Sequence, residues 1–193
     1  MNILDLFAGS GGFSLGFESA GLSTKHAVEL DKFACETLQN NFQDTQVYCK
    51  DVCSMTDSFI KKEFKKTDII IGGPPCQGFS VAGPSQYGIK DSRNKLVFEM
   101  HRFTEILKPQ VCIIENVPGL IRATTKNSIL EDLVNRFAKT GYKANINLLD
   151  SKYFGVPQSR KRAFIIFSKE NLVDIPFKKD EKFISVYEAI SDL

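Results

Sequence analysis

The segment GGPPCQ, residues 72–77, places the thiol of Cys76 directly after two prolines and at the end of an apolar run. Each proline fixes its own φ angle and restricts the residue before it, so the backbone holds the thiol in one direction. A thiol that is held in place and faces solvent is a candidate nucleophile, since the thiolate is the reactive form of cysteine. The alternative is a cysteine buried in an ordinary loop, which the two prolines disfavour.

A second group of residues is suited to binding a ligand. The turn AGSGG contains Gly9 and Gly11, which allow positive φ angles and a close approach of the backbone to a ligand. Glu29 and Asp51 each end a later apolar stretch, where a carboxylate can accept hydrogen bonds from ribose hydroxyls or an adenine amino group. The turn lacks the dinucleotide-binding pattern and the P-loop lysine, and no cation is obvious nearby. A phosphate-free ligand such as S-adenosylmethionine therefore fits better than a dinucleotide, although either acid alone could be a solvated strand end.

A third group lies later in the chain. Glu115 follows the apolar run VCII, and QSRKR places Arg160 and Arg162 two residues apart. In an extended segment, residues i and i+2 project to the same side, so both guanidinium groups can face one site. Taken alone, the carboxylate could cap a turn, and the arginines would be interpreted as a basic surface cluster.

Apolar runs and amphipathic helical stretches alternate along the chain and must position these groups. Strands are expected at residues 2–7, 25–30, 46–50, 67–72, 111–117, 143–150 and 162–168. Helices are expected at residues 13–20, 32–40, 94–107 and 127–141. In the second helix, Phe33, Leu38 and Phe42 are expected to form the apolar side.

The repeated strand–helix–strand order predicts a parallel sheet with helices on both faces. Only residues 151–162 separate the last two strands, without a helical pattern, so the seventh strand should run antiparallel. The expected fold class is therefore α/β: a Rossmann-like class I S-adenosylmethionine-dependent methyltransferase with a seven-stranded, mostly parallel sheet and one antiparallel strand. Residues 1–193 are expected to form one domain.

Composition narrows the class of protein further. The chain has 193 residues, of which 42% are hydrophobic and 25% charged, with a net charge of +2. Binding to nucleic acid would therefore need a local basic patch. The five cysteines are odd in number and lack zinc-site spacing, which favours free thiols in a reducing compartment and no metal. No long apolar run or leader is present, so the protein is expected to be cytoplasmic, without a membrane partner.

In order and spacing, DLFAGSGGF, VELDKFA, GGPPCQGFS, ENVPG and QSRKR resemble the motifs of bacterial-type DNA (cytosine-5)-methyltransferases. The resemblance covers residues 2–193. It implies methyl transfer from S-adenosylmethionine to cytosine in double-stranded DNA, as in restriction-modification systems of bacteria or phages. The enzyme would be cytoplasmic and associated with the nucleoid.

The resemblance also assigns roles to individual residues. Cys76 would add to carbon 6 of cytosine, and Glu115 would hydrogen-bond nitrogen 3. Arg162 would contact the carbonyl oxygen of the base, and Arg160 the flanking phosphate or the active-site carboxylate. The residues that would bind S-adenosylmethionine are Phe7, Gly9, Gly11, Glu29, Leu30, Asp51, Val52 and Pro75.

The target base must leave the DNA stack to react, and a polar loop at residues 77–94 is expected to close over it. Ser80, Ser85, Gln86 and Arg93 are the expected DNA-facing residues of this loop.

In the family, a target-recognition region and further motifs follow QSRKR, whereas this sequence ends in ISVYEAISDL, which resembles the short helix before that region. A catalytic portion is therefore expected, as a subunit that works with a second chain, a truncated gene product or a proteolytic fragment. Two other functions stay open: methylation of tRNA, and a cofactor-binding regulatory protein without activity.

Overall fold

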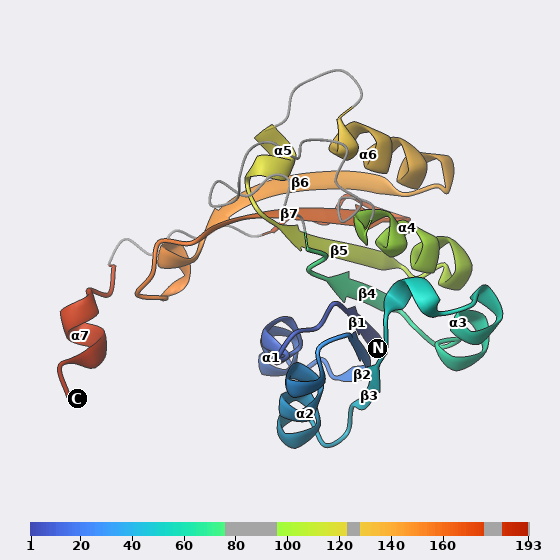
Figure 1. The fold of residues 1–193 in the computed structure, drawn as a ribbon. Helices are drawn as coiled ribbons and strands as arrows, with labels where there is room; N and C mark the ends of the chain where they lie inside the picture. Colours follow the sequence, from blue (N-terminus) through green and yellow to red (C-terminus); the bar gives the residue numbers. More distant parts are fainter. Residues whose placement is uncertain (76–95, 123–127, 176–182, 193) are drawn as a thin grey trace, which may run out of the picture.

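A seven-stranded sheet forms the centre of the molecule (Figure 1). The computed structural model describes residues 1–75, 96–122, 128–175 and 183–192. Within these ranges the strand order is β3-β2-β1-β4-β5-β7-β6. The strands are β1 (Ile3–Leu6), β2 (Thr24–Glu29), β3 (Gln46–Cys49), β4 (Ile69–Gly72), β5 (Val111–Asn116), β6 (Lys143–Asp150) and β7 (Lys161–Ser168).

The prediction of one antiparallel strand is confirmed. β7 runs antiparallel to both of its neighbours, β5 and β6, while the pairs from β3 to β5 are parallel. The short link between β6 and β7 explains this direction, because residues 151–160 contain only the 3₁₀ turn η5 (Ser151–Phe154) and a loop. A parallel return would need a crossover of a dozen residues or more.

Helices cover both faces of the sheet, as predicted for a doubly wound fold. α3, α4 and α6 cover one face, and α1 and α2 cover the other (Figure 1). The helical elements are α1 (Gly12–Ser19), α2 (Lys32–Asn41), the 3₁₀ turn η1 (Val52–Ser54), α3 (Asp57–Glu63), α4 (Leu96–Leu107), α5 (Gly119–Arg122), α6 (Ile129–Lys139) and α7 (Val186–Ile190).

The larger core lies between the sheet and α3, α4 and α6. Phe64, Phe103 and Phe137 are fully buried there. Phe137 stacks on Phe167 of β7 with the ring centroids 3.6 Å apart. On the opposite face, Phe13 of α1 meets Phe164 of β7 edge to face at 6.1 Å. Helices therefore pack on both faces of the sheet and fix the positions of its strand ends.

The expected apolar side of the second helix was partly wrong. Leu38 and Phe42 are buried, but the side chain of Phe33 is 76% exposed. Phe33 lies five residues before Leu38, which is about 140° around a helix of 3.6 residues per turn. Cys35 precedes Leu38 by three residues, shares its side of the helix and is buried instead.

The region between β3 and β4 contains η1 and α3, which the sequence pattern did not predict. α3 has only seven residues, too few for a clear helical period. Its start is set locally, because the side-chain oxygen of Thr56 accepts a hydrogen bond from the Phe59 amide at 3.3 Å. Both elements matter for the site described below.

The helix expected near residues 127–141 is present as α6. Ser128 caps its start by accepting a hydrogen bond from the Glu131 amide, and Gly141 follows its end with a φ angle of +87°. The short C-terminal helix is α7, which lies away from the sheet beyond the far ends of β6 and β7 (Figure 1). No helix in the described ranges is long and apolar enough to cross a membrane.

Candidate active site

A cavity of about 320 Å³ opens at the carboxyl ends of β1, β2, β3 and β4. In an open α/β sheet this edge is where ligands bind. The lining residues are Phe7, Val28, Glu29, Leu30, Lys50, Asp51, Val52, Gly73, Pro75 and Leu96. The structure thus brings together every residue predicted to bind the cofactor except the two glycines. We call this cavity the adenosyl cavity for the ligand that its residues were predicted to bind.

Glu29 fixes the glycine turn beside this cavity. Its Oε2 accepts a hydrogen bond from the Gly9 amide at 2.7 Å. Its Oε1 accepts from the amides of Leu30 at 2.7 Å and Asp31 at 2.8 Å. A carboxylate has about four acceptor positions, so three backbone bonds leave room for a ligand hydroxyl. Glu29 therefore shapes the cavity as well as lining it.

The backbone around the glycine turn is unusual. Phe7 has a φ angle of +58°, a conformation that non-glycine residues rarely adopt and that costs on the order of 1–3 kcal/mol. Gly11 has a φ angle of +92°, and a Cβ atom there would lie 2.3 Å from the Phe42 ring. Packing on α2 therefore explains glycine at position 11, while the space beside Gly9 is open.

Asp51 and Lys50 form the far wall of the adenosyl cavity. The Oδ1 of Asp51 accepts a hydrogen bond from the Cys53 amide at 2.9 Å, which caps η1 and orients the carboxylate. The expectation that no cation lies near was wrong, because Lys50 lines the cavity. Its ammonium group lies 5.1 Å from the centroid of the Phe59 ring, in a cation–π contact.

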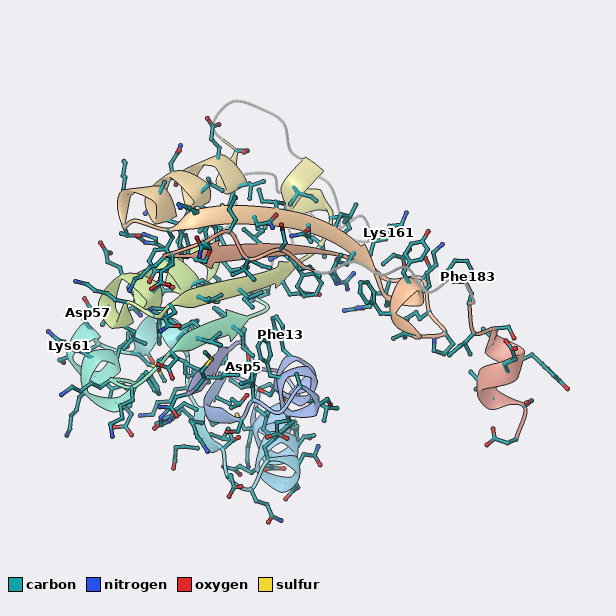
Figure 2. All side chains as sticks on the ribbon, turned by 180° about the vertical axis from the view of Figure 1, so that it is seen from behind. Asp5, Phe13, Asp57, Lys61, Lys161 and Phe183 are labelled. Atoms are coloured by element: carbon teal, nitrogen blue, oxygen red, sulfur yellow. The ribbon has the colours of Figure 1, made fainter. Side chains whose placement is uncertain are left out.

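Beneath the glycine turn lies a buried acid that the sequence reasoning missed. Asp5 of β1 is fully buried and accepts a hydrogen bond from the Ser14 hydroxyl at 2.6 Å (Figure 2 labels Asp5 and Phe13). Thr24 donates in turn to the Ser14 oxygen at 3.0 Å. The Oδ1 of Asp5 has no hydrogen-bond partner among the described residues, and burial raises the pKa of this carboxyl to about 7. The signal was a charged residue inside the otherwise apolar stretch ILDLF.

A second cavity, of about 370 Å³, lies further along the same edge of the sheet. It is lined by Glu115, Leu149, Ser151, Phe154, Val156, Arg160, Arg162 and Phe164. One site therefore contains the three predicted catalytic residues that lie within the described ranges, Glu115, Arg160 and Arg162. We call it the base cavity, for the cytosine base that Glu115 and Arg162 were predicted to contact. The predicted nucleophile Cys76 and the predicted loop residues Ser80, Ser85, Gln86 and Arg93 lie outside the described residues.

Glu115 and Arg162 form an ion pair across β5 and β7. The Nε of Arg162 lies 2.8 Å from the Oε1 of Glu115, and the two side chains are 23% and 27% exposed. The strand register causes this contact, since Glu115 pairs with Phe164, two residues from Arg162. The arginine that pairs with the Glu115 carboxylate is thus Arg162. The sequence analysis had given this carboxylate as one of two possible partners of Arg160.

Arg160 is exposed at the rim of the base cavity and is placed by its backbone. Its amide donates to the Oδ1 of Asp150 at 3.0 Å, and the Ser159 hydroxyl donates to the Oδ2 at 3.1 Å. Asp150 is only 5% exposed and ends β6. This acid, which sequence reasoning also missed, holds the turn that carries both arginines.

The segment between β4 and Cys76 connects the two cavities. Gly73 lines the adenosyl cavity, and a Cβ atom on it would lie 3.4 Å from the Oε2 of Glu115. The side-chain amide of Asn116 donates to the Pro74 carbonyl at 3.0 Å. The end of β5 therefore holds the proline segment between a ligand-sized cavity and a carboxylate.

The two cavities offer a ligand different groups. One cavity offers carboxylates and apolar walls that suit adenine and ribose, and the other offers a carboxylate–guanidinium pair. No group of three or more His, Cys, Asp or Glu residues is arranged to hold a metal ion in the parts of the chain that the structure describes.

The chain is similar to DNA methyltransferases of known sequence and structure. Type II methyltransferase M.DdeI of Desulfomicrobium norvegicum is 39% identical over 202 residues, covering 100% of this chain and 48% of its own length. M1.HphI of Haemophilus parahaemolyticus is 35% identical, covering 98% of this chain and 52% of its own length. The chain thus spans about half the length of these curated relatives.

Solved structures show the same fold. A DNA modification methyltransferase encoded within an Escherichia coli prophage superposes with a TM-score of 0.82 at 33% identity, covering 98% of this chain and 54% of its own. Spodoptera frugiperda DNMT2 superposes with a TM-score of 0.71 at 25% identity, covering 95% and 54%. The sequence model of the C-5 cytosine-specific DNA methylases matches residues 1–192, and the chain belongs to this family.

Proposed function

We propose that this chain is the catalytic portion of an enzyme that methylates carbon 5 of cytosine in double-stranded DNA, with S-adenosylmethionine as the methyl donor. The observation that carries the proposal is the pair of cavities on one sheet edge, joined by residues 73–75. One cavity would hold the methyl donor and the other the target base, with the predicted nucleophile following Pro75 in the sequence.

The residues that line the adenosyl cavity suit the chemistry of the donor. Glu29 would accept hydrogen bonds from the ribose hydroxyls, and the Asp51 carboxylate would accept one from the adenine amino group. Leu30, which is 68% exposed at the cavity, would pack on the adenine face. When bound, S-adenosylmethionine supplies an electrophilic methyl group. Phe7, Gly9, Gly11, Val52 and Pro75 are proposed to complete this site.

We propose a covalent route for the reaction at the base cavity. The Cys76 thiolate would add to carbon 6 of cytosine, and the electron pair displaced into the ring would be balanced by a proton that Glu115 shares with nitrogen 3. Carbon 5 would then bond to the methyl carbon, and the bond from that carbon to the sulfonium would break, so that S-adenosylhomocysteine leaves. Carbon 5 would lose its proton to a base, and the returning electron pair would expel the thiolate. Arg162, now paired with Glu115, would hold that carboxylate and contact the carbonyl oxygen of the base.

The target base must be flipped out of the duplex, at a cost of roughly a few kcal/mol. Val156 and Phe154 line the base cavity and are 42% and 43% exposed, so this side of the site can receive further protein. We propose that a target-recognition region, from the same protein or a second chain, covers it and supplies phosphate and base contacts. Arg160 would contribute a flanking phosphate contact.

The proposed setting is a bacterial or phage restriction-modification system, with the enzyme in the cytoplasm and on the nucleoid. The proposed chemistry requires no metal, because the thiol and the charged pair supply the nucleophile and the proton. The relatives described above are type II methyltransferases of bacteria, which supports this setting.

The test is to trap the covalent adduct. The protein is mixed with S-adenosylmethionine and a duplex containing 5-fluorocytosine, with and without a recognition region taken from a relative. The fluorine cannot leave as a proton does, so a DNA adduct should persist on a denaturing gel, and Cys76→Ala should form none. Transfer of labelled methyl to tRNA but not to duplex DNA would contradict the substrate. Donor binding without any adduct would favour the regulatory alternative.

A further inference from the structure

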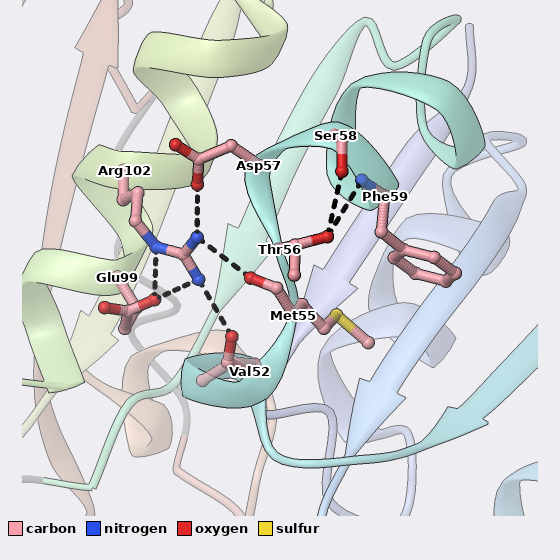
Figure 3. A network of polar contacts seen from close by, with 8 residues as sticks. All are labelled: Val52, Met55, Thr56, Asp57, Ser58, Phe59, Glu99 and Arg102. Carbon is pink, nitrogen blue, oxygen red and sulfur yellow. Dashed lines mark hydrogen bonds and ion pairs between the residues drawn. The ribbon is translucent and has the colours of Figure 1, made fainter.

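Arg102 of α4 joins four separate groups across the molecule (Figure 3). Its Nε and Nη2 contact the Glu99 carboxylate at 2.7 Å, and its Nη1 donates to the Oδ1 of Asp57 at 2.7 Å. Its Nη1 also donates to the Met55 carbonyl at 3.0 Å, and its Nη2 to the Val52 carbonyl at 2.9 Å. One guanidinium group thus holds the backbone at both ends of the segment 52–55.

The environment favours the charged form of Arg102. Its side chain is 27% exposed, and this burial alone would disfavour the charge. The carboxylates of Glu99 and Asp57 outweigh that cost and raise the pKa of the guanidinium. Asp57 is 72% exposed whereas Glu99 is 20% exposed, so Glu99 is the more strongly held partner. Hydrogen bonds from a charged donor are about twice as strong as neutral ones.

The segment that Arg102 holds is a wall of the adenosyl cavity. Val52 lines that cavity and begins η1, whose cap is Asp51. Leu96, the first residue of α4, lines the same cavity. The Arg102 contacts therefore tie two walls together that are 44 positions apart in the sequence (52 to 96). A three-residue 3₁₀ turn has few bonds of its own, so the guanidinium fork sets where its carbonyls lie.

We propose that Arg102 is a positioning residue that holds Asp51 and Val52 where they select adenine, an inference that rests on the proposed function. Arg102 lies behind the wall and does not line the cavity. It acts through the carbonyls of Val52 and Met55, which place the Asp51 carboxylate toward the 6-position of the base. The selectivity of the site for adenine, and not only its affinity, should depend on this arginine.

The test compares S-adenosylhomocysteine with S-inosylhomocysteine, whose hypoxanthine carries a carbonyl in place of the amino group. In the unchanged protein, the Asp51 oxygen would face that carbonyl, so the inosyl compound should bind about tenfold or more weakly. In Arg102→Met, the adenosyl compound should bind about tenfold more weakly, and the two compounds should differ by less than about threefold. A merely structural role would weaken both compounds equally and leave their ratio unchanged.

Two further variants separate positioning from stability. Arg136→Met is the matched control, because Arg136 also pairs with a helical carboxylate, Asp132, through two bonds at 3.0 and 3.1 Å. Arg136 lies on α6 and contacts α4 through the Phe98 ring, but among the described residues it donates to no carbonyl of the segment 52–55. It should leave the ratio unchanged. Arg102→Lys keeps the charge but lacks the fork that reaches two carbonyls. It should recover much of the thermal stability lost in Arg102→Met without recovering the selectivity.

Hydrogen exchange in the free protein tests, without any ligand, whether Arg102 holds the segment 52–55 in place. In the free protein, Arg102→Met should speed exchange of the amides at residues 53–55 at least tenfold more than exchange in β1. Faster exchange with an unchanged ligand ratio would overturn the role in selectivity, and unchanged exchange would overturn the positioning itself. If the unchanged protein binds neither compound, the proposed function fails, while the exchange result still decides whether Arg102 holds the segment.

Discussion

The two cavities on one sheet edge are held in different ways. In the adenosyl cavity, three backbone amides hold the Glu29 carboxylate, and a fourth amide holds Asp51. In the base cavity, the carboxylate of Glu115 is held by another side chain, Arg162, at the meeting of two antiparallel strands. Backbone amides thus position the carboxylates of the adenosyl cavity, whereas a side-chain ion pair positions the carboxylate of the base cavity.

This difference indicates what each site can do before a ligand arrives. Carboxylates fixed by backbone amides are already oriented, so a ligand loses little free energy in ordering them. An ion pair between two side chains, each about one quarter exposed, can exchange partners when a base enters. We therefore expect changes in the adenosyl cavity to act on binding and changes in the base cavity to act on turnover.

Glu115→Gln should have the largest effect. The amide keeps the shape but cannot share a proton with nitrogen 3, so methyl transfer should fall by about 10² to 10⁴-fold. The measurement is the initial rate of labelled methyl transfer to duplex DNA, with a recognition region supplied. Affinity for S-adenosylhomocysteine should stay within about twofold. Loss of affinity equal to the loss of rate would show that the two cavities are not separate.

Asp5→Asn should change how stability depends on pH. Because the pKa of Asp5 is raised to about 7 in the folded protein, the unfolded chain loses this proton at lower pH than the folded chain. The proton-linked stability is therefore complete below about pH 4 and is lost as the pH rises through 7. Asp5→Asn has no carboxyl group at this position, so it does not lose this stability as the pH rises. The difference in free energy of unfolding between Asp5→Asn and the parent should therefore shift in favour of the variant by about 2–3 kcal/mol from pH 5 to pH 8.

Denaturant unfolding at several pH values measures this difference. Asp44→Asn is the control, since Asp44 is exposed and should follow the parent at every pH. A constant difference between Asp5→Asn and the parent would mean that Asp5 is ionised at ordinary pH. It would then lie in a more polar setting than its burial indicates.

Glu29→Ala should weaken binding of S-adenosylmethionine by about 1–3 kcal/mol, the range for hydrogen bonds to a charged group. The loss includes the ribose contacts and the freed amide of Gly9. Titration calorimetry gives the value. Glu36→Ala is a matched control because Glu36 is an exposed acid that pairs with Lys32 at 3.9 Å. Equal affinities for the parent and Glu29→Ala would place the ribose elsewhere.

The smallest effect tests which arginine partners the carboxylate. A double-mutant cycle of Arg162→Met with Glu115→Gln should give a coupling of about 0.5–1 kcal/mol in the free energy of unfolding. The same cycle with Arg160→Met should give a coupling near zero, since the Arg160 side chain is exposed. Equal couplings would mean that the carboxylate alternates between the two arginines.

Local rules predicted much of the fold, and most of the described residues that were named as site residues line one of the two cavities. Alternation of apolar runs located the strands, and Gly141 ended the expected helix close to the observed end of α6. The residues assigned by resemblance, such as Glu29, Asp51 and Pro75, came together in one cavity. The prediction that Phe33 is buried was wrong, because Phe33 lies five residues before Leu38 and therefore does not share its side of the helix.

The sequence could not predict the residues whose role depends on distant partners. Arg102 looks like one charge in an amphipathic helix, and its carbonyl partners lie 47 and 50 positions away in the chain. Asp150 looks like a strand end, although it anchors the turn that carries Arg160. Neither contact leaves a periodic signal in the sequence.

By itself, the sequence determined the order of the strands along the chain, the antiparallel seventh strand and many of the polar residues that line the two cavities. These depend on residue type, short-range spacing and the length of each connection, which are local properties. Only the tertiary structure decided that Arg162 meets Glu115, that Asp5 is buried and that Arg102 supports the adenosyl cavity. These outcomes depend on strand register and on which helix packs over which loop, so they arise only when the whole sheet has assembled.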